Sequence, residues 1–398
     1  MDNQGMIAMG QDYVMNTYGR CPMGIARGRG AKVWDGDGTV YLDFVAGIAV
    51  NNVGHCHPAV VKAIREQAEI LLHCSNLYWN ENQVKLAKEI VANSCAEKVF
   101  FCNSGAEATE GALKLARRWA SRQGKTAKNR IITAANSFHG RTLGALTATG
   151  QTKYQAGFGP MLPELIHVPY NDLPALAAAV DENTCAVLLE TVQGEGGVLP
   201  GEPAYFAGVV ALREKFNFLL MIDEVQTGFG RTGKLFGYQH LDVTPDVFTM
   251  AKALGGGLPM GALAARGAAA TALQPGEHAA TFGGGPLVAA AALASLSVIL
   301  REDLPAAAEQ KGRYIKERVG GWTELAGLIT DVRGQGLMLG IEVTCDGNKV
   351  AEECRQKGLL INCIHGQVLR LVPPLVVTEA EIDQALGVLR EVLAGCRR

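Results

Sequence analysis

The segment that decides the fold is DVFTMAKALGGG, residues 246–257. Its β-branched and aromatic first half is typical of a buried strand, and its glycine cluster is typical of a turn. Lys252 lies where the strand would meet the turn. Burial there would disfavour the ammonium form, lower the pKa of Lys252 and leave a neutral amine that can attack a carbonyl. The alternative interpretation is a rim lysine whose charged end reaches water.

A second apolar run ends in two carboxylates. Residues 218–222 read FLLMI and are followed by Asp223 and Glu224. Side chains at the carboxyl ends of parallel strands meet at the edge where ligands bind, so we expect Asp223 and Lys252 to face one cleft. A carboxylate about 4 Å from a protonated pyridine nitrogen stabilises the ring cation by roughly 4 kcal/mol before desolvation. The alternative is a carboxylate that caps the next helix, which suits Glu224 better than Asp223.

A third feature resembles a phosphate site. Residues 98–102 are predicted to form a strand and residues 106–119 a helix, with Ser104 and Gly105 in the turn between them. Free backbone N–H groups at such a helix start bind phosphate, a serine adds a hydroxyl, and a glycine allows close approach. Any serine-capped helix looks similar when taken alone. Together with the lysine and the acid, however, the turn indicates a phosphorylated pyridine aldehyde, pyridoxal 5'-phosphate (PLP).

Five motifs carry a family resemblance. They are residues 104–108 (SGAEA), 137–142 (SFHGRT), 193–197 (QGEGG), 223–228 (DEVQTG) and 251–252 (AK) with the glycines that follow. In this order and at this spacing they resemble the class III PLP-dependent aminotransferases. The resemblance runs from Tyr13 to the C-terminus and is greatest for members that act on acetylornithine.

The resemblance implies a set of cofactor contacts. Lys252 would form a Schiff base with PLP and then move a proton between the substrate carbon and C4' of the cofactor. Asp223 would pair with the ring nitrogen. Thr281 would reach the phosphate of the neighbouring subunit, which makes the expected assembly a homodimer. The remaining cofactor contacts would be Ser104, Gly105 and Ala106 at the phosphate, Phe138 and Val225 at the two ring faces, and Gln226 at the phenolic oxygen.

The resemblance also implies a substrate site with two arginines. Arg141 would bind the carboxylate of acetylornithine, and Arg370 the α-carboxylate of glutamate. Glu195 would neutralise Arg370 while an amine donor is bound. The physical logic is that a guanidinium orients a carboxylate through two parallel hydrogen bonds, and a transaminase must accept two different substrates in turn. For Arg370 the alternative interpretation is a structural salt bridge at a strand end.

Three positions depart from the family pattern. Gly285 replaces an asparagine in the loop after Thr281, Ala279 replaces a glycine, and Thr109 stands where asparagine is common. The loss of the asparagine side chain is expected to loosen the loop that carries Thr281. We therefore expect these departures to affect the affinity for the cofactor more than the catalytic activity.

Composition limits the other classes of function. The chain has 398 residues, a net charge of −2 and ten cysteines without a C-x-x-C pair. These values give no support for nucleic-acid or anionic-membrane binding, a zinc ribbon or a redox motif. His55 and His57 lack a second ligand cluster, so no metal is expected. Without a signal peptide or a long apolar span, the protein is expected in the cytoplasm with free thiols.

Strand and helix candidates alternate between residues 57 and 286, which predicts an α/β protein with a mostly parallel central sheet. The resemblance implies fold type I of the PLP-dependent transferases. We expect a large PLP-binding domain at residues 57–286. A smaller α+β domain is expected from residues 1–56, which include a hairpin at residues 32–44, together with residues 287–398.

The expected reaction moves the terminal amino group of N2-acetyl-L-ornithine to 2-oxoglutarate, as in arginine biosynthesis. Ornithine, succinylornithine, succinyldiaminopimelate and 4-aminobutyrate remain alternative donors. A PLP aminomutase has less need of two carboxylate-binding arginines, and a PLP-binding regulator would need a DNA-binding segment that the sequence does not show.

Overall fold

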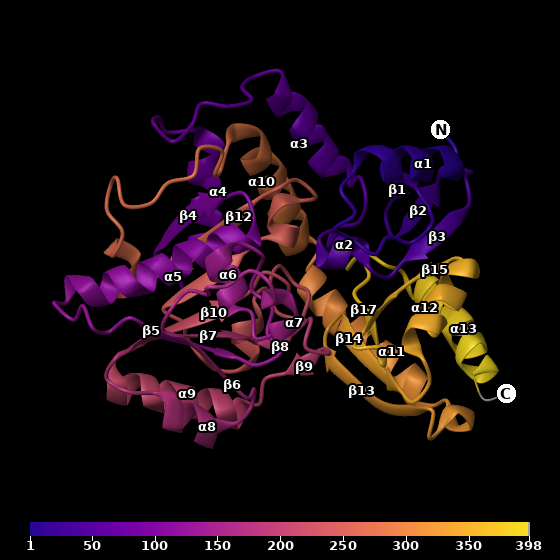
Figure 1. The fold of residues 1–398 in the computed structure, drawn as a ribbon. Coiled ribbons are helices and arrows are strands. Elements are labelled where there is room, and N and C mark those ends of the chain that lie inside the picture. Colours follow the sequence, from indigo (N-terminus) through magenta and orange to yellow (C-terminus); the bar gives the residue numbers. More distant parts are fainter. Residues whose placement is uncertain (397–398) are drawn as a thin grey trace.

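The computed structural model describes residues 1–396, and a seven-stranded sheet forms its centre (Figure 1). The strand order is β4-β12-β11-β10-β7-β5-β6. Strands β11, β10, β7, β5 and β6 run parallel, whereas β12 is antiparallel to both of its neighbours. The predicted mostly parallel sheet is therefore confirmed. Its strands are β4 Lys98–Cys102, β5 Arg130–Ala134, β6 Leu165–Val168, β7 Thr184–Glu190, β10 Leu219–Asp223, β11 Val247–Met250 and β12 Gly261–Ala265.

Helices cover both faces of this sheet, and alternate residues of the strands pack against them. Leu188 and Met221 belong to the apolar cluster that includes the buried side of α5 (Gly105–Arg122). Their neighbours Leu189 and Ile222 belong to the cluster that includes α9 (Pro203–Phe216). Because both faces are buried, the strands are continuous apolar runs.

The two ends of the chain meet in a second part of the molecule (Figure 1). The predicted hairpin is present as β2 (Lys32–Asp35) and β3 (Val40–Asp43), and β3 also pairs in parallel with β15 (Leu359–Leu360). A separate antiparallel sheet has the order β13-β14-β17-β16. Its strands are β13 Ile329–Gln335, β14 Met338–Val343, β17 Val368–Leu371 and β16 Asn362–Ile364; the remaining strands are β1 Ile25–Arg29, β8 Val192–Gln193 and β9 Leu199–Pro200.

The remaining helices surround these sheets. They are α1 Asn3–Tyr13, α2 Ala46–Ala49, α3 Pro58–Ala68, α4 Glu81–Ala92, α6 Leu143–Ala148, α7 Thr152–Gln155, α8 Leu173–Ala179, α10 Pro286–Arg301, α11 Leu304–Gly320, α12 Gly347–Gln356 and α13 Glu379–Gly395. The short 3-10 helices of the described chain are η1 Gly237–His240, η2 Lys252–Gly255, η3 Gly267–Thr271 and η4 Thr323–Leu325.

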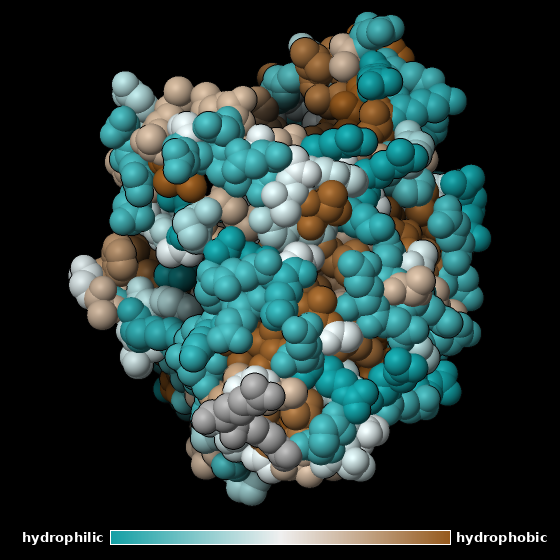
Figure 2. Space-filling model, turned by 90° about the vertical axis from the view of Figure 1, so that its right-hand side faces the viewer, coloured by the Kyte–Doolittle hydropathy of each residue, from teal (hydrophilic) through white to brown (hydrophobic). Residues whose placement is uncertain are grey.

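The outer face formed by the chain ends is mainly polar. Figure 2 shows this side of the molecule, where hydrophilic side chains cover most of the surface and hydrophobic ones gather in separate patches. Within residues 1–396, no helix has both the length and the apolar character needed to cross a bilayer.

Candidate active site

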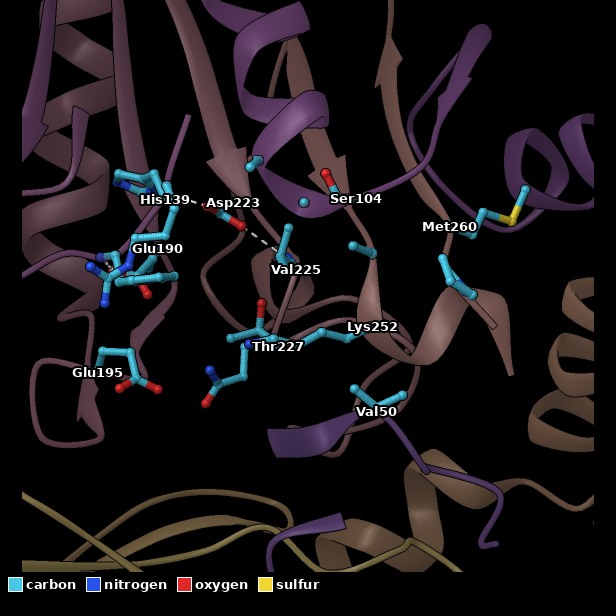
Figure 3. Close-up of a pocket in the computed structure, with 18 of the residues that line it drawn as sticks. Val50, Ser104, His139, Glu190, Glu195, Asp223, Val225, Thr227, Lys252 and Met260 are labelled. Atoms are coloured by element: carbon cyan, nitrogen blue, oxygen red, sulfur yellow. Dashed lines mark hydrogen bonds and ion pairs between the residues drawn. The ribbon is translucent and has the colours of Figure 1, made fainter. Parts of the chain in front are cut away.

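A cavity of about 480 Å³ opens at the carboxyl ends of the parallel strands (Figure 3). It lies between the turns that follow β4, β5, β10 and β11, with β7 ending beside it. Of the twelve predicted site residues, ten line it: Ser104, Gly105, Ala106, Phe138, Arg141, Glu195, Asp223, Val225, Gln226 and Lys252. Arg370 contacts two of these residues from behind, and Thr281 lies elsewhere.

Lys252 begins η2 directly after β11, so the strand ends two residues earlier than the apolar run suggests. It keeps some accessible surface because it lines the cavity, yet its amine is surrounded by protein. Burial lowers the pKa of Lys252 to about 8, and the charge of Arg370 acts in the same direction. The backbone of Lys252 has φ of 46°, a left-handed conformation that is unfavourable for a side chain with a Cβ. Such strain persists only where the surrounding structure enforces the position of the residue.

Asp223 ends β10 and is hydrogen-bonded on both oxygens. Oδ1 accepts from the backbone N–H of Val225 at 3.0 Å, and Oδ2 lies 2.7 Å from Nδ1 of His139. Burial alone would lower the pKa of His139, but the hydrogen bond and charge of Asp223 raise it overall. The pair therefore places a carboxylate, supported by an imidazole, at the edge of the cavity.

Glu190 ends β7 and lies beside Asp223 in the strand register. Burial raises the pKa of Glu190 to about 8, so this carboxyl is mostly protonated at neutral pH. The sequence interpretation assigned no role to Glu190 or His139. Both carried a usable signal, because Glu190 ends an apolar strand as Asp223 does, and His139 lies inside the SFHGRT motif.

The start of α5 forms an anion site. Ser104 is its N-cap, and Oγ of Ser104 accepts from the N–H of Glu107 at 3.2 Å. The N–H groups of Gly105 and Ala106 have no hydrogen-bond acceptor within residues 1–396. A Cβ on Gly105 would lie 3.0 Å from Cγ1 of Val225, which is closer than an ordinary contact, so a glycine suits this position. Free N–H groups at a helix start favour a bound phosphate.

These groups have the chemistry that PLP requires. One cavity holds an amine of lowered pKa, a buried carboxylate and backbone donors without an acceptor among residues 1–396. The three would suit the aldehyde, the ring nitrogen and the phosphate of the cofactor respectively. Phe138 and Val225 add apolar surface to the same cavity.

The two arginines differ in their surroundings. Nη1 of Arg370 lies 2.5 Å from Oε1 of Glu195 and 3.3 Å from Oε1 of Gln226. Burial alone would raise the pKa of Glu195, but the charge and hydrogen bond of Arg370 lower it overall. Arg141 makes no ion pair within residues 1–396, and its guanidinium carbon lies 3.9 Å from the centre of the Tyr154 ring. Within residues 1–396, one guanidinium is thus paired with a carboxylate and the other lies over an aromatic ring without an ion pair.

Thr281 is exposed and lies outside the cavity. Two side-chain amides hold the loop that carries Thr281. One belongs to Asn76, in the segment before α4, and the other to Gln83, within α4. Nδ2 of Asn76 donates to the carbonyls of Ala280 (2.9 Å) and Gly283 (3.0 Å), and Nε2 of Gln83 donates to that of Gly283. The expected loosening of this loop stays a prediction.

The capping alternative holds for Glu224, which is buried and accepts hydrogen bonds from the N–H groups of Gly237 and Tyr238 at the start of η1. The two histidines near residue 56 also have structural partners. His55 lies 2.7 Å from Asp43, and His57 caps α3.

Comparisons with known proteins identify the family of the chain. Residues 13–393 match the family model of class-III aminotransferases, so the chain belongs to that family. It is therefore a PLP-dependent aminotransferase. It is 52% identical to the acetylornithine aminotransferase of Caldanaerobacter subterraneus subsp. tengcongensis, over 98% of this chain and all of that protein. The corresponding enzyme of Methanothermobacter thermautotrophicus is 47% identical, over 99% of this chain and all of the relative.

Solved structures show the same fold. The ornithine aminotransferase of Toxoplasma gondii has a TM-score of 0.95 and 34% identity, with 99% of this chain and 96% of that chain covered. A second structure of that enzyme has PLP at its active site in partial occupancy, with a TM-score of 0.95, 33% identity and coverage of 99% and 95%. The acetylornithine aminotransferase of Elizabethkingia anophelis has a TM-score of 0.89 and 32% identity, with 99% and 100% covered. The predicted fold class and cofactor are confirmed.

Proposed function

We propose that the protein transfers the terminal amino group of N2-acetyl-L-ornithine to 2-oxoglutarate. The products are N-acetylglutamate semialdehyde and glutamate, and the reaction belongs to arginine biosynthesis. The full-length relatives named above support this donor. The structural observation that carries the proposal is the pairing of Arg370 with Glu195 beside Lys252, while Arg141 has no ion pair among the described residues.

The residues of the chain divide the work around Lys252. When bound, PLP supplies an aldehyde for covalent attachment and an electron-withdrawing ring. Lys252 would attach the cofactor and later carry a proton to and from the substrate carbon, which its lowered pKa permits near neutral pH. Asp223, supported by His139, would keep the ring nitrogen protonated.

The other cofactor contacts would hold the ring and its phosphate in place. The N–H groups of Gly105 and Ala106, with Ser104, would bind the phosphate. Phe138 and Val225 would confine the two ring faces, and Gln226 would meet the phenolic oxygen. All six residues border the cavity.

Two arginines would serve the two substrates. Arg141 would bind the carboxylate of acetylornithine, whose reacting amine is distant from it. Glutamate carries its amine beside a carboxylate, which would bind Arg370 after Glu195 moves away. While Glu195 stays in place, the site disfavours a donor that would offer its α-amine.

We also assign a homodimer as the working assembly, with Thr281 completing the phosphate site of the partner. Large apolar side chains close to Thr281 support this, since Leu77, Trp79 and Phe282 are 84%, 89% and 63% exposed. Such exposure is uncommon on a monomer surface. A cytoplasmic location fits the ten cysteines, all of which are free thiols.

A panel of amine donors with 2-oxoglutarate tests the reaction, ranked by kcat/KM. N-acetylornithine should rank above ornithine, succinylornithine, succinyldiaminopimelate and 4-aminobutyrate. Another donor at the top would replace the proposed substrate. An aminomutase would form no glutamate from 2-oxoglutarate with any of them.

A further inference from the structure

Arg231 is fully buried and has no carboxylate partner within residues 1–396. Its Nη1 donates to the carbonyls of Leu337 (2.8 Å) and Pro373 (2.6 Å), and its Nη2 donates to Oδ1 of Asn52 (2.7 Å). Burial lowers the pKa of Arg231 to about 9, which leaves it charged at neutral pH. A buried charge without a counter-ion lowers the stability of the folded state, so an apolar residue here would stabilise the fold more than Arg231 does.

The acceptors of Arg231 belong to distant parts of the chain. Asn52 follows α2, Leu337 precedes β14 and Pro373 follows β17. Arg231 itself lies in the segment after β10. The last residue of β10, Asp223, and Gln226 of this segment both line the cavity. The guanidinium of Arg231 therefore connects the segment that borders the cavity with the N-terminal part of the chain, through Asn52, and with the C-terminal part, through Leu337 and Pro373.

The contact falls at the end of the strand pair that carries Arg370. In the antiparallel pair β14–β17, Leu339 faces Leu371 and Gly340 faces Arg370. Extended by two residues, this register sets Leu337 opposite Pro373. Arg231 thus binds both strands at one end, three residues along the chain from Arg370.

Backbone contacts make this connection tight. The N–H of Leu337 donates to the carbonyl of Arg231 at 3.0 Å, so the two residues exchange hydrogen bonds in both directions. A Cβ on Gly336 would lie 2.4 Å from the carbonyl carbon of Thr232. The turn before β14 therefore packs directly on the segment that holds Arg231.

We propose that Arg231 is a positioning residue that fixes the position of Arg370 against Glu195 and Gln226, which line the cavity. It would thereby set the affinity for glutamate, whose carboxylate adjoins the amine that is transferred. Arg141 lies between β5 and α6 and shares none of these contacts, so the acetylornithine side should depend on Arg231 far less. This inference rests on the proposed role of Arg370.

The test compares two half-reactions of the PLP-loaded enzyme. Arg231→Lys and Arg231→Met should raise the glutamate concentration at half-maximal rate about tenfold or more. This factor corresponds to the loss of one charge-assisted hydrogen bond. The same value for N-acetylornithine should change less than about threefold. An equal loss for both donors, or no loss for either, overturns the positioning role.

Two further variants keep the result interpretable. Asn52→Ala removes one acceptor but keeps the guanidinium, so it should shift glutamate in the same direction by a smaller factor even where Arg231→Met does not fold. Lys128→Met removes another buried cation, which donates to the backbone carbonyls of Glu182 and Phe216 and does not line the cavity. It should leave the ratio of the two donors unchanged. A changed ratio in Lys128→Met would overturn the assignment to Arg231.

Arg370→Lys separates this inference from the function on which it rests. If this change leaves the glutamate half-reaction intact, the assigned role of Arg370 is wrong. A different outcome is that Arg370→Lys abolishes the half-reaction with glutamate while Arg231→Lys weakens the half-reactions with glutamate and N-acetylornithine equally. In that case only the positioning role of Arg231 is wrong.

Discussion

The lysine amine can attack the cofactor only when it is unprotonated. Because burial lowers the pKa of Lys252 to about 8, the neutral form should become dominant above that pH. The rate at which cofactor-free protein binds PLP covalently should therefore rise with pH and level off above about 8, well below the ordinary lysine range. Stopped-flow absorbance measures this rate. A midpoint of about 10 would contradict the effect of burial, and Lys252→Ala, the control, should trap no cofactor upon borohydride reduction.

The charge of Glu195 decides whether Arg370 is open to a carboxylate. Glu195→Ala should let the α-carboxylate of ornithine bind Arg370 and increase transfer of the α-amine relative to the terminal amine. A change on the order of tenfold corresponds to one charge-assisted hydrogen bond. Product analysis by mass spectrometry measures the ratio. The control is Glu342→Ala, which removes a carboxylate paired with Arg333 outside the cavity; unchanged regiochemistry in Glu195→Ala would show that Glu195 is no switch.

At the residue scale, sequence reasoning found the groups whose chemistry is unusual for their place. A lysine and an aspartate at the ends of apolar strands are conspicuous, and Lys252 and Asp223 do meet at one cavity. His139 is conspicuous as part of the SFHGRT motif, but its contact with Asp223 could not be predicted, because the two residues are distant in sequence and a histidine has many structural uses. The left-handed backbone of Lys252 was equally hidden, since nothing in the residue type favours it.

Among the elements, the loop that carries Thr281 depends on the segment before α4. Asn76→Ala removes hydrogen bonds to Ala280 and Gly283 and the one that Gln83 donates to Asn76. Cofactor retention should fall several-fold if this loop completes the partner's phosphate site, since each lost bond contributes about 1 kcal/mol. Equilibrium dialysis measures retention. Asn93→Ala, which removes only a contact within its own helix, should have no effect; retention unchanged in Asn76→Ala would mean that the loop is held by other contacts.

The predicted ends of helices and strands agree with the structure where an apolar run and a helix-capping residue occur together. The strand at residues 98–102 ends at a serine cap, and both it and α5 lie where expected, with α5 extending to Arg122. The antiparallel strand β12 was not predicted. Its small residues, GALAA, give no period, and the direction of a strand depends on the path of the chain before it.

For the whole molecule, the main prediction is that one subunit completes the site of another. Thr281→Ala should weaken cofactor retention several-fold, because the threonine hydroxyl would no longer reach the partner's phosphate. Dialysis combined with sedimentation velocity relates the loss to assembly. Thr271→Ala changes another exposed threonine and serves as the control; equal retention in Thr281→Ala and Thr271→Ala would place the whole phosphate site in one subunit.

The division into domains at residues 57 and 286 remains our proposal. The pairing of β3 with β15 supports a small domain made from both chain ends. Sequence reasoning reached this arrangement through the family resemblance, because no local pattern reports a contact between residues that are hundreds of positions apart. The hydrogen bonds of Arg231 lay beyond such reasoning for the same reason.

The pairing of Leu42 with Leu359 also constrains biosynthesis of the protein. A ribosome adds roughly 5 to 20 residues each second, so strand β3 emerges on the order of tens of seconds before its neighbour exists. Throughout that interval its edge is unpaired and open to chaperones or to other nascent chains. A circular permutation that moves the N-terminal segment with β3 to the C-terminus, after β15, would shorten the interval in which the edge of β3 is unpaired.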